Sequence, residues 1–205
     1  MLGKIFESIV LHAESAGIEF QAPDKRKATG SYYTTRIVVH FICRESLRLY
    51  FINRAVQLAD GGTGVSPVEA HGQDAHATWA VRISRVFKEI DPDEGFDEAE
   101  LKLLRENLLP VEGKRCLEAL NGLRTLDPAV GSGAFPVGLL HELVSLRRVF
   151  ECVANGYKDP VKGEGDTWKQ RAKEHFIQNS LFGVDIQQQA IEICRLRIWL
   201  SLLVD

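Results

Sequence analysis

Residues 127–135, Asp-Pro-Ala-Val-Gly-Ser-Gly-Ala-Phe, carry the strongest structural signal in this chain of 205 residues. The short apolar run before them, residues 124–127, predicts a buried strand that ends in an acid. Gly131 and Gly133 would let the backbone approach a ligand closely, and a helix predicted to follow would point its first N–H groups at the same place. The string differs from the dinucleotide-binding fingerprint, because Pro136 replaces the third glycine.

A second strand and helix follow in the same order. Residues 181–185 predict a short strand that also ends in an acid, and residues 187–204 carry apolar side chains at helical spacing. Strand, glycine turn, helix, strand, acid and helix open a doubly wound, Rossmann-like α/β sheet. Only about two strands are visible, and a stable sheet of this kind needs more. We therefore expect the chain to be a truncated α/β fold.

The sequence divides into two expected regions, a mainly helical one at 1–123 and the first part of the α/β domain at 124–205. Residues 60–78 are rich in Gly, Ala, His and Pro and have no apolar period, which predicts an inserted surface loop. Two His and an Asp in this loop lack the rigid support of a metal site, so we predict no metal. Helical spacing of apolar residues predicts helices at 2–15, 35–56, 79–90, 96–109, 116–123, 135–153 and 167–179.

Composition and charge limit the possible functions. The chain is 45% hydrophobic with a net charge of −3, and its one dense basic run is 25–27, which favours a solvated connector over a DNA contact. Few phosphate contacts are therefore expected from this chain. The four cysteines stand far apart without a CxxC motif, which predicts buried, reduced thiols in a cytoplasmic protein. The longest apolar stretch, 198–204, is too short to span a membrane, and Glu7 interrupts any signal peptide.

The string at 127–135 resembles the cofactor loop of the N6-adenine DNA methyltransferases of restriction–modification systems, type I and type II, including fused type IIG enzymes. Residues 30–34, Gly-Ser-Tyr-Tyr-Thr, resemble the G-x-Y-Y-T-P element that precedes this loop in the family. Residues 181–186 and the helix through 196–200 resemble its second strand and following helix, and residues 2–7 its opening helix. The likeness covers most of the chain except 57–95 and 155–170. It implies the N-terminal, cofactor-binding portion of such an enzyme.

This resemblance implies a class I methyltransferase fold with S-adenosylmethionine as cofactor. Asp127 would lie near the ammonium of the methionine end, and Asp185 would accept the ribose hydroxyls. Backbone at Gly131 and Gly133 would pass beneath the methionine and ribose, and Ile186 would pack on the adenine. The implied cofactor-binding residues are Tyr33, Thr34, Asp127, Pro128, Ala129, Gly131, Gly133, Phe135, Asp185 and Ile186.

The tyrosine element departs from the family pattern at one position. Tyr33 and Thr34 would contact the methionine carboxylate, but Thr35 stands where the family usually has proline. Threonine leaves a free N–H and a looser backbone there. A simpler alternative is that Tyr32 and Tyr33 only pack the helical region onto the sheet.

The catalytic motif of the family, (Asn/Asp/Ser)-Pro-Pro-(Tyr/Phe/Trp), does not occur, because the 205 residues contain no Pro-Pro pair. That motif accepts the hydrogens of the adenine amine and stacks on the flipped base. We assign no catalytic residue and expect this chain alone to be inactive. A target-recognition region missing from this chain would bind duplex DNA, with a specificity or nuclease subunit as a further partner.

Two other functions remain open on the sequence. One is a truncated or degenerate module that binds S-adenosylmethionine without catalysis. The other is a methyltransferase acting on RNA or on protein glutamine, which would share the cofactor loop. The tyrosine element at 30–34 favours DNA over the latter. Trp199 and the leucines after it are interpreted as core packing.

Overall fold

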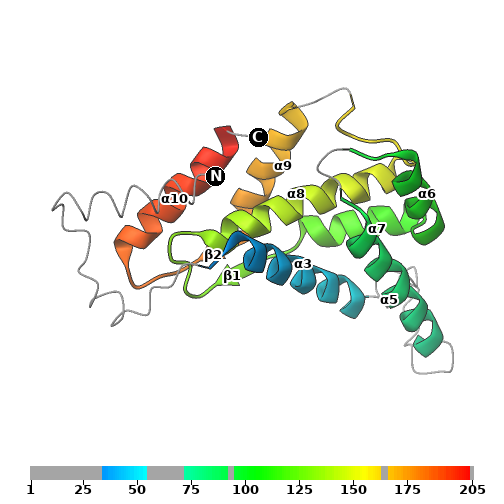
Figure 1. Ribbon diagram of the computed structural model, residues 1–205, viewed down its shortest axis with the longest axis horizontal. Helices are drawn as coiled ribbons and strands as arrows, with labels where there is room; N and C mark the ends of the chain where they lie inside the picture. The colour runs from blue at the N-terminus through cyan, green and yellow to red at the C-terminus, as the bar shows by residue number, and fades with distance from the viewer. Residues whose placement is uncertain (1–33, 55–71, 92–94, 163–165, 204–205) are drawn as a thin grey trace. The chain divides into compact units, whose positions relative to one another are not determined.

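The computed structural model describes residues 34–54, 72–91, 95–162 and 166–203. The chain divides into two units, Met1–Thr34 and Thr35–Asp205, and the fold below is that of the second unit. The helix predicted at 2–15, residue Tyr33 and the part of the predicted loop at 60–71 lie outside the described residues. The described elements are α3 (Arg36–Asn53), α5 (Gly72–Glu89), α6 (Glu98–Asn107), α7 (Pro110–Asn121), β1 (Thr125–Asp127), α8 (Ala134–Ala154), α9 (Asp166–Asn179), β2 (Leu181–Gly183) and α10 (Gln188–Leu203) (Figure 1).

Helix α8 is the centre of the unit, and α3, α7, α9 and α10 pack around it (Figure 1). Two small residues permit the closest approaches. A methyl group at Gly113 of α7 would lie 2.7 Å from Val153 Cγ1, and one at Gly138 of α8 would collide with Val39 of α3. Buried aromatic rings extend the core between helices, since Phe51 of α3 and Phe150 of α8 have ring centroids 5.0 Å apart.

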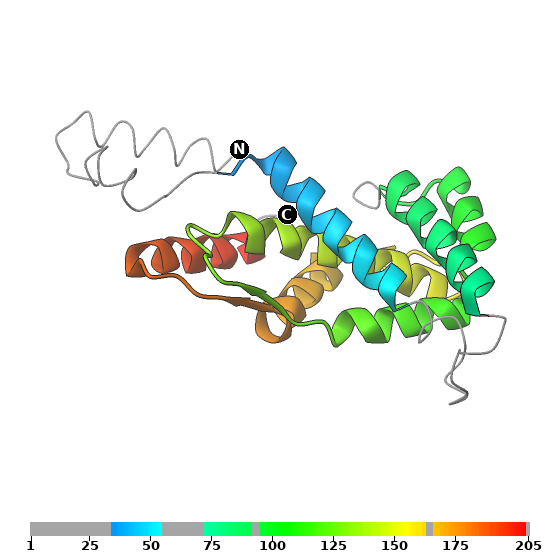
Figure 2. The ribbon, with the colours of Figure 1, turned by 90° about the horizontal axis from the view of Figure 1, so that it is seen from below.

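The two strands pair in parallel, with Thr125 opposite Leu181, Leu126 opposite Phe182 and Asp127 opposite Gly183. Helices α8 and α9 connect them, so their carboxyl ends lie at the same edge of the sheet (Figure 2). Both strands stand where the sequence predicts them. The part of the chain that the structure describes holds these two strands, so the doubly wound sheet stays a prediction.

Two helix starts differ from the sequence prediction. Helix α5 begins at Gly72 rather than near 79, so the predicted surface loop is too long at its C-terminal end. Residues 73–77 contain neither Gly nor Pro and tolerate a helix, although they have no apolar period. Helix α7 begins at Pro110 rather than 116, because proline is well suited to a first helical turn and Glu112 accepts the Leu109 N–H at 2.8 Å.

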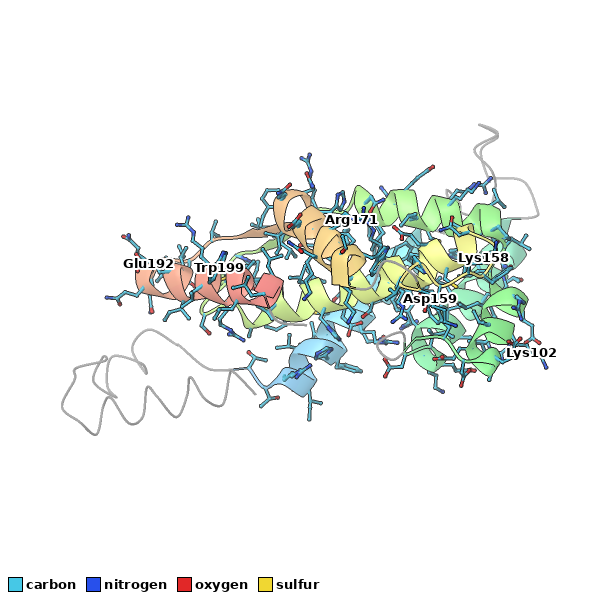
Figure 3. All side chains as sticks on the ribbon, turned by 90° about the horizontal axis from the view of Figure 1, so that it is seen from above. Lys102, Lys158, Asp159, Arg171, Glu192 and Trp199 are labelled. Carbon is cyan, nitrogen blue, oxygen red and sulfur yellow. The ribbon has the colours of Figure 1, made fainter. Side chains whose placement is uncertain are left out.

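Buried and exposed side chains test two further predictions. All four cysteines are free and buried, as predicted. The interpretation of Trp199 as a core residue is wrong, because Trp199 lies on α10 and is 56% exposed (Figure 3). Leu196 and Leu203 of the same helix are exposed as well. Helical spacing cannot distinguish a core stripe from an uncovered one. Among the described residues, no helix is both long and apolar enough to cross a membrane.

Candidate functional site

The carboxyl ends of β1 and β2 bring two acids to one edge of the sheet. Strand pairing continues past both strands, since Val184 N–H donates to Asp127 O and Val130 N–H donates to Val184 O, each at 3.0 Å. Asp127 and Asp185 therefore flank the turn at 128–133, as the order of elements predicts. Side-by-side parallel strands make this edge the usual place for a ligand in an open α/β sheet.

Asp127 has one satisfied and one unsatisfied carboxylate oxygen. Its Oδ1 accepts the Ala129 N–H at 3.0 Å, which folds the chain into the turn. Its Oδ2 is buried and has no hydrogen-bond partner in the described part of the chain. An unpaired buried acceptor is unfavourable by about 1–3 kcal/mol, more when charged. A ligand ammonium or a bridging water would satisfy this oxygen.

The two glycines of the turn serve different purposes. Both have a left-handed backbone, with φ of 52° at Gly131 and 84° at Gly133. A methyl group at Gly131 would meet only the Ala129 carbonyl oxygen at 4.0 Å, so this residue faces open space. One at Gly133 would lie 2.6 Å from Cys194 Sγ, so the close neighbour of Gly133 is helix α10. Gly131 alone thus leaves its side of the turn free for a ligand.

Asp185 fixes the turn as well as standing beside it. Its Oδ2 accepts the Gly131 N–H at 2.8 Å, and its Oδ1 accepts the Gln187 N–H at 2.8 Å. Asp185 is half-buried. A carboxylate oxygen has two lone pairs, so each can accept a second hydrogen bond from a hydroxyl.

The other residues predicted from the sequence differ in their position and exposure. Pro128 and Ala129 are exposed within it, and Phe135 is half-buried in the first turn of α8. Ile186 follows Asp185 and its apolar side chain is 95% exposed. Tyr33 is outside the described residues and Thr34 belongs to the other unit, so their roles stay predictions.

Sequence reasoning missed Arg197, which also contacts the turn. Its Nη1 donates to the Ser132 carbonyl oxygen at 3.0 Å and lies 3.3 Å from Ser132 Oγ. Nothing in the spacing between these residues indicates the contact.

The buried thiols near the turn are not suited to act as nucleophiles. Burial raises the pKa of the Cys43 thiol to about 11, and the Glu142 and Asp127 carboxylates add to this effect. Burial also raises the pKa of Cys194, with Arg197 opposing and Asp127 reinforcing the shift. Both thiols stay protonated at neutral pH, whereas the thiolate is the reactive form.

Comparison with known proteins gives one informative match. No protein-family model matches the chain, and no solved structure matches it. A protein of Methanocaldococcus jannaschii named "putative type II restriction enzyme and methyltransferase" is 26% identical over 207 residues. The match covers 99% of this chain and 14% of the relative.

The chain is thus similar to a restriction–modification methyltransferase. The similarity extends over nearly the whole chain, so the aligned span contains residues 127–135 and 181–186. It agrees with the class of enzyme that the residues at 127–135 indicate. The chain spans about a seventh of the relative's length.

Proposed function

We propose that this chain forms the S-adenosylmethionine-binding part of a site-specific DNA methyltransferase that modifies the N6 amine of adenine. The similarity to a restriction–modification methyltransferase supports the reaction class and hence the cofactor. The likeness of residues 30–34 and 127–135 to the adenine-specific family supports the base and the atom.

The observation that carries the proposal is the unsatisfied Oδ2 of Asp127. It is a buried anionic acceptor at the carboxyl end of a parallel strand, beside a turn whose Gly131 faces open space. An ammonium group would neutralise it and supply the missing hydrogen bond. S-adenosylmethionine carries such a group at its methionine end, so the residues present fit this cofactor.

The remaining groups of the cofactor match the other residues of the site. Asp185 would accept the ribose hydroxyls while it keeps its bonds to the Gly131 and Gln187 amides. Ile186 would pack on the adenine, which accounts for an isoleucine left 95% exposed. The first N–H groups of α8 carry a partial positive charge that favours the methionine carboxylate. When bound, S-adenosylmethionine supplies the activated methyl group.

The exposed face of the sheet supports the proposed doubly wound fold. Leu126 and Phe182 pair across the two strands, Val184 follows two residues later, and the three are 65%, 47% and 53% exposed. Parallel sheets are normally buried on both faces. In our proposal further strands and helices, encoded elsewhere in a longer protein, cover this face and bring the catalytic motif and the DNA-reading region.

Methyl transfer to DNA tests the proposal. The 205-residue chain and a longer protein that contains it are each incubated with methyl-labelled S-adenosylmethionine and duplex DNA. We expect label on adenine N6 with the longer protein and none with the 205-residue chain. Asp185→Ala in the longer protein should reduce labelling, while Glu192→Ala, an exposed acid on α10, should not. Label on cytosine, RNA or protein glutamine would overturn the assignment, and no label from either protein would favour a module without catalysis.

A further inference from the structure

The glycine turn is held from two sides by charged groups of opposite sign. Asp185 accepts the N–H of Gly131, and Arg197 donates to the carbonyl oxygen of Ser132. These backbone groups belong to two different peptide bonds, and the peptide between Gly131 and Ser132 lies between the two anchors. Acid and arginine therefore determine together which way this short segment faces.

Such anchoring matters because the flanking residues are glycines. Gly131 and Gly133 are both left-handed, and glycine adopts positive and negative φ with similar ease. Within the turn, the peptide between Ser132 and Gly133 is held at its N–H, because the Gly133 N–H donates to the Val130 carbonyl oxygen at 2.9 Å. The hydrogen bond from Arg197 holds the other end of the same peptide at the Ser132 carbonyl, and Cys194, one helical turn earlier on α10, closes the space beside Gly133.

The chemistry of this contact favours arginine. A guanidinium is planar and holds its N–H donors in fixed directions, so one nitrogen can reach both the carbonyl and the hydroxyl of Ser132. Lysine keeps the charge but presents a single, freely rotating ammonium. Arg197 is half-buried, which limits competition from water for these bonds.

We propose that Arg197 is a positioning residue for cofactor binding: it acts through Ser132 and keeps the glycine turn in the shape that receives the methionine end of S-adenosylmethionine. This inference rests on the proposed function. It assigns to α10 a role in shaping the site, in addition to packing against α8.

Two measurements on the whole chain test the inference. Hydrogen exchange of the free protein should be faster over residues 130–135 in Arg197→Ala than in the wild type, with unchanged exchange in the centre of α8. Calorimetry should show roughly tenfold weaker binding of S-adenosylhomocysteine, which corresponds to the loss of one charge-assisted hydrogen bond. Arg197→Lys should fall between, and Arg195→Ala, which alters an exposed arginine of the same helix, should match the wild type.

Adenosine separates positioning from a general loss of structure. It lacks the methionine end, so Arg197→Ala should weaken its binding much less than that of S-adenosylhomocysteine. Equal losses for both ligands, or unchanged exchange over 130–135, would overturn the positioning role. If the wild-type chain bound neither ligand, the proposed function would fail instead, and the exchange measurement would still decide whether Arg197 holds the turn.

Discussion

At the scale of single residues, the two acids of the site are not equivalent. Asp127 has a buried oxygen free of hydrogen bonds among the described residues, whereas both oxygens of Asp185 already accept backbone N–H groups. The sequence indicates both acids equally, because each ends a predicted strand. Only the structure shows that Asp185 ties the glycine turn to the second strand.

Replacing Asp185 should weaken cofactor binding in two ways. Asp185→Ala removes the acceptor for the ribose and releases the Gly131 N–H, and the loss of charge-assisted bonds of roughly 1.5–3 kcal/mol predicts ten- to a hundredfold weaker binding. Asp185→Asn keeps an oxygen acceptor and should lose less. Titration calorimetry with S-adenosylhomocysteine measures both variants. Equal affinities of Asp185→Ala and the wild type would remove Asp185 from the site.

Alanine at the two turn glycines should have unequal effects on stability. Gly131→Ala places a side chain in open space and is opposed only by its positive φ, which predicts a loss of about 1–2 kcal/mol. Gly133→Ala has the same backbone problem and also collides with Cys194, so it should lose about 1–3 kcal/mol more. Urea denaturation compares the pair. A larger loss at Gly131 would contradict the packing of α10 against the turn.

At the scale of elements, the sequence predicts the positions of most helices well, but it does not predict which of their faces are covered. Helical periodicity places α8, α9 and α10 within a residue or two, and the strands stand where short apolar runs end in acids. The start of α5 was missed because helix formation at 73–77 has no apolar period to reveal it. Trp199 was misassigned because periodicity shows a stripe and not what covers it.

A hydrogen-bond network around the buried carboxylate of Glu142 links α8, α3 and α5 and should be important for stability. Glu142 of α8 is 4% exposed, and it accepts from His40 Nδ1 at 2.9 Å and Arg44 Nη1 at 3.3 Å, both on α3. Arg44 also donates to the Phe87 carbonyl of α5 at 2.8 Å. Glu142→Ala leaves Arg44 without its counter-ion and should lower the free energy of unfolding by about 3 kcal/mol.

The matched control for Glu142 is Glu45 on α3. The Glu45 side chain is 39% exposed where that of Glu142 is 4% exposed, so Glu45→Ala should change stability by less than about 1 kcal/mol. Urea denaturation of both variants makes the comparison. Similar losses for the two would mean that the buried network does not hold α3 on α8.

The ion pair between Arg148 of α8 and Asp159 predicts a pH dependence of stability. Arg148 donates to both oxygens of Asp159, at 3.0 and 2.7 Å (Asp159 is labelled in Figure 3). Burial opposes ionisation, but the bonds from Arg148 and the Val161 N–H outweigh it and lower the pKa of Asp159 below 3.8. Because the pKa of Asp159 is lower in the folded state, the ion pair contributes its full stabilisation of the fold at pH values above the pKa of Asp159 in the unfolded chain. This contribution is lost as the pH falls through the pKa of Asp159 in the folded protein.

Asp159→Asn tests this dependence. The difference in unfolding free energy between wild type and variant should be constant from about pH 5 to 7 and should shrink as pH falls below about 4. Urea denaturation at several pH values measures the difference directly. A difference that grows on acidification would show that the sign of the pKa shift is wrong.

At the scale of the whole molecule, the described unit is a set of helices packed around α8, with a two-stranded parallel sheet beside α8 and α9. Its sheet face at Leu126, Phe182 and Val184 is apolar and exposed, and so is the stripe of α10 at Trp199. The order of strand, turn and helix is enough to predict the parallel pairing. It does not reveal which faces stay uncovered, because that depends on segments distant in sequence or on other chains.

We propose that S-adenosylmethionine binds at the carboxyl ends of β1 and β2. Hydrogen exchange of the 205-residue chain with and without S-adenosylhomocysteine tests it most directly, because this product analogue cannot react. We expect the amide hydrogens of residues 127–137 and 181–187 to exchange more slowly when S-adenosylhomocysteine is present. Exchange over α6 and α7 should not change. Unchanged exchange at both segments, or protection confined to other parts of the chain, would contradict the claim.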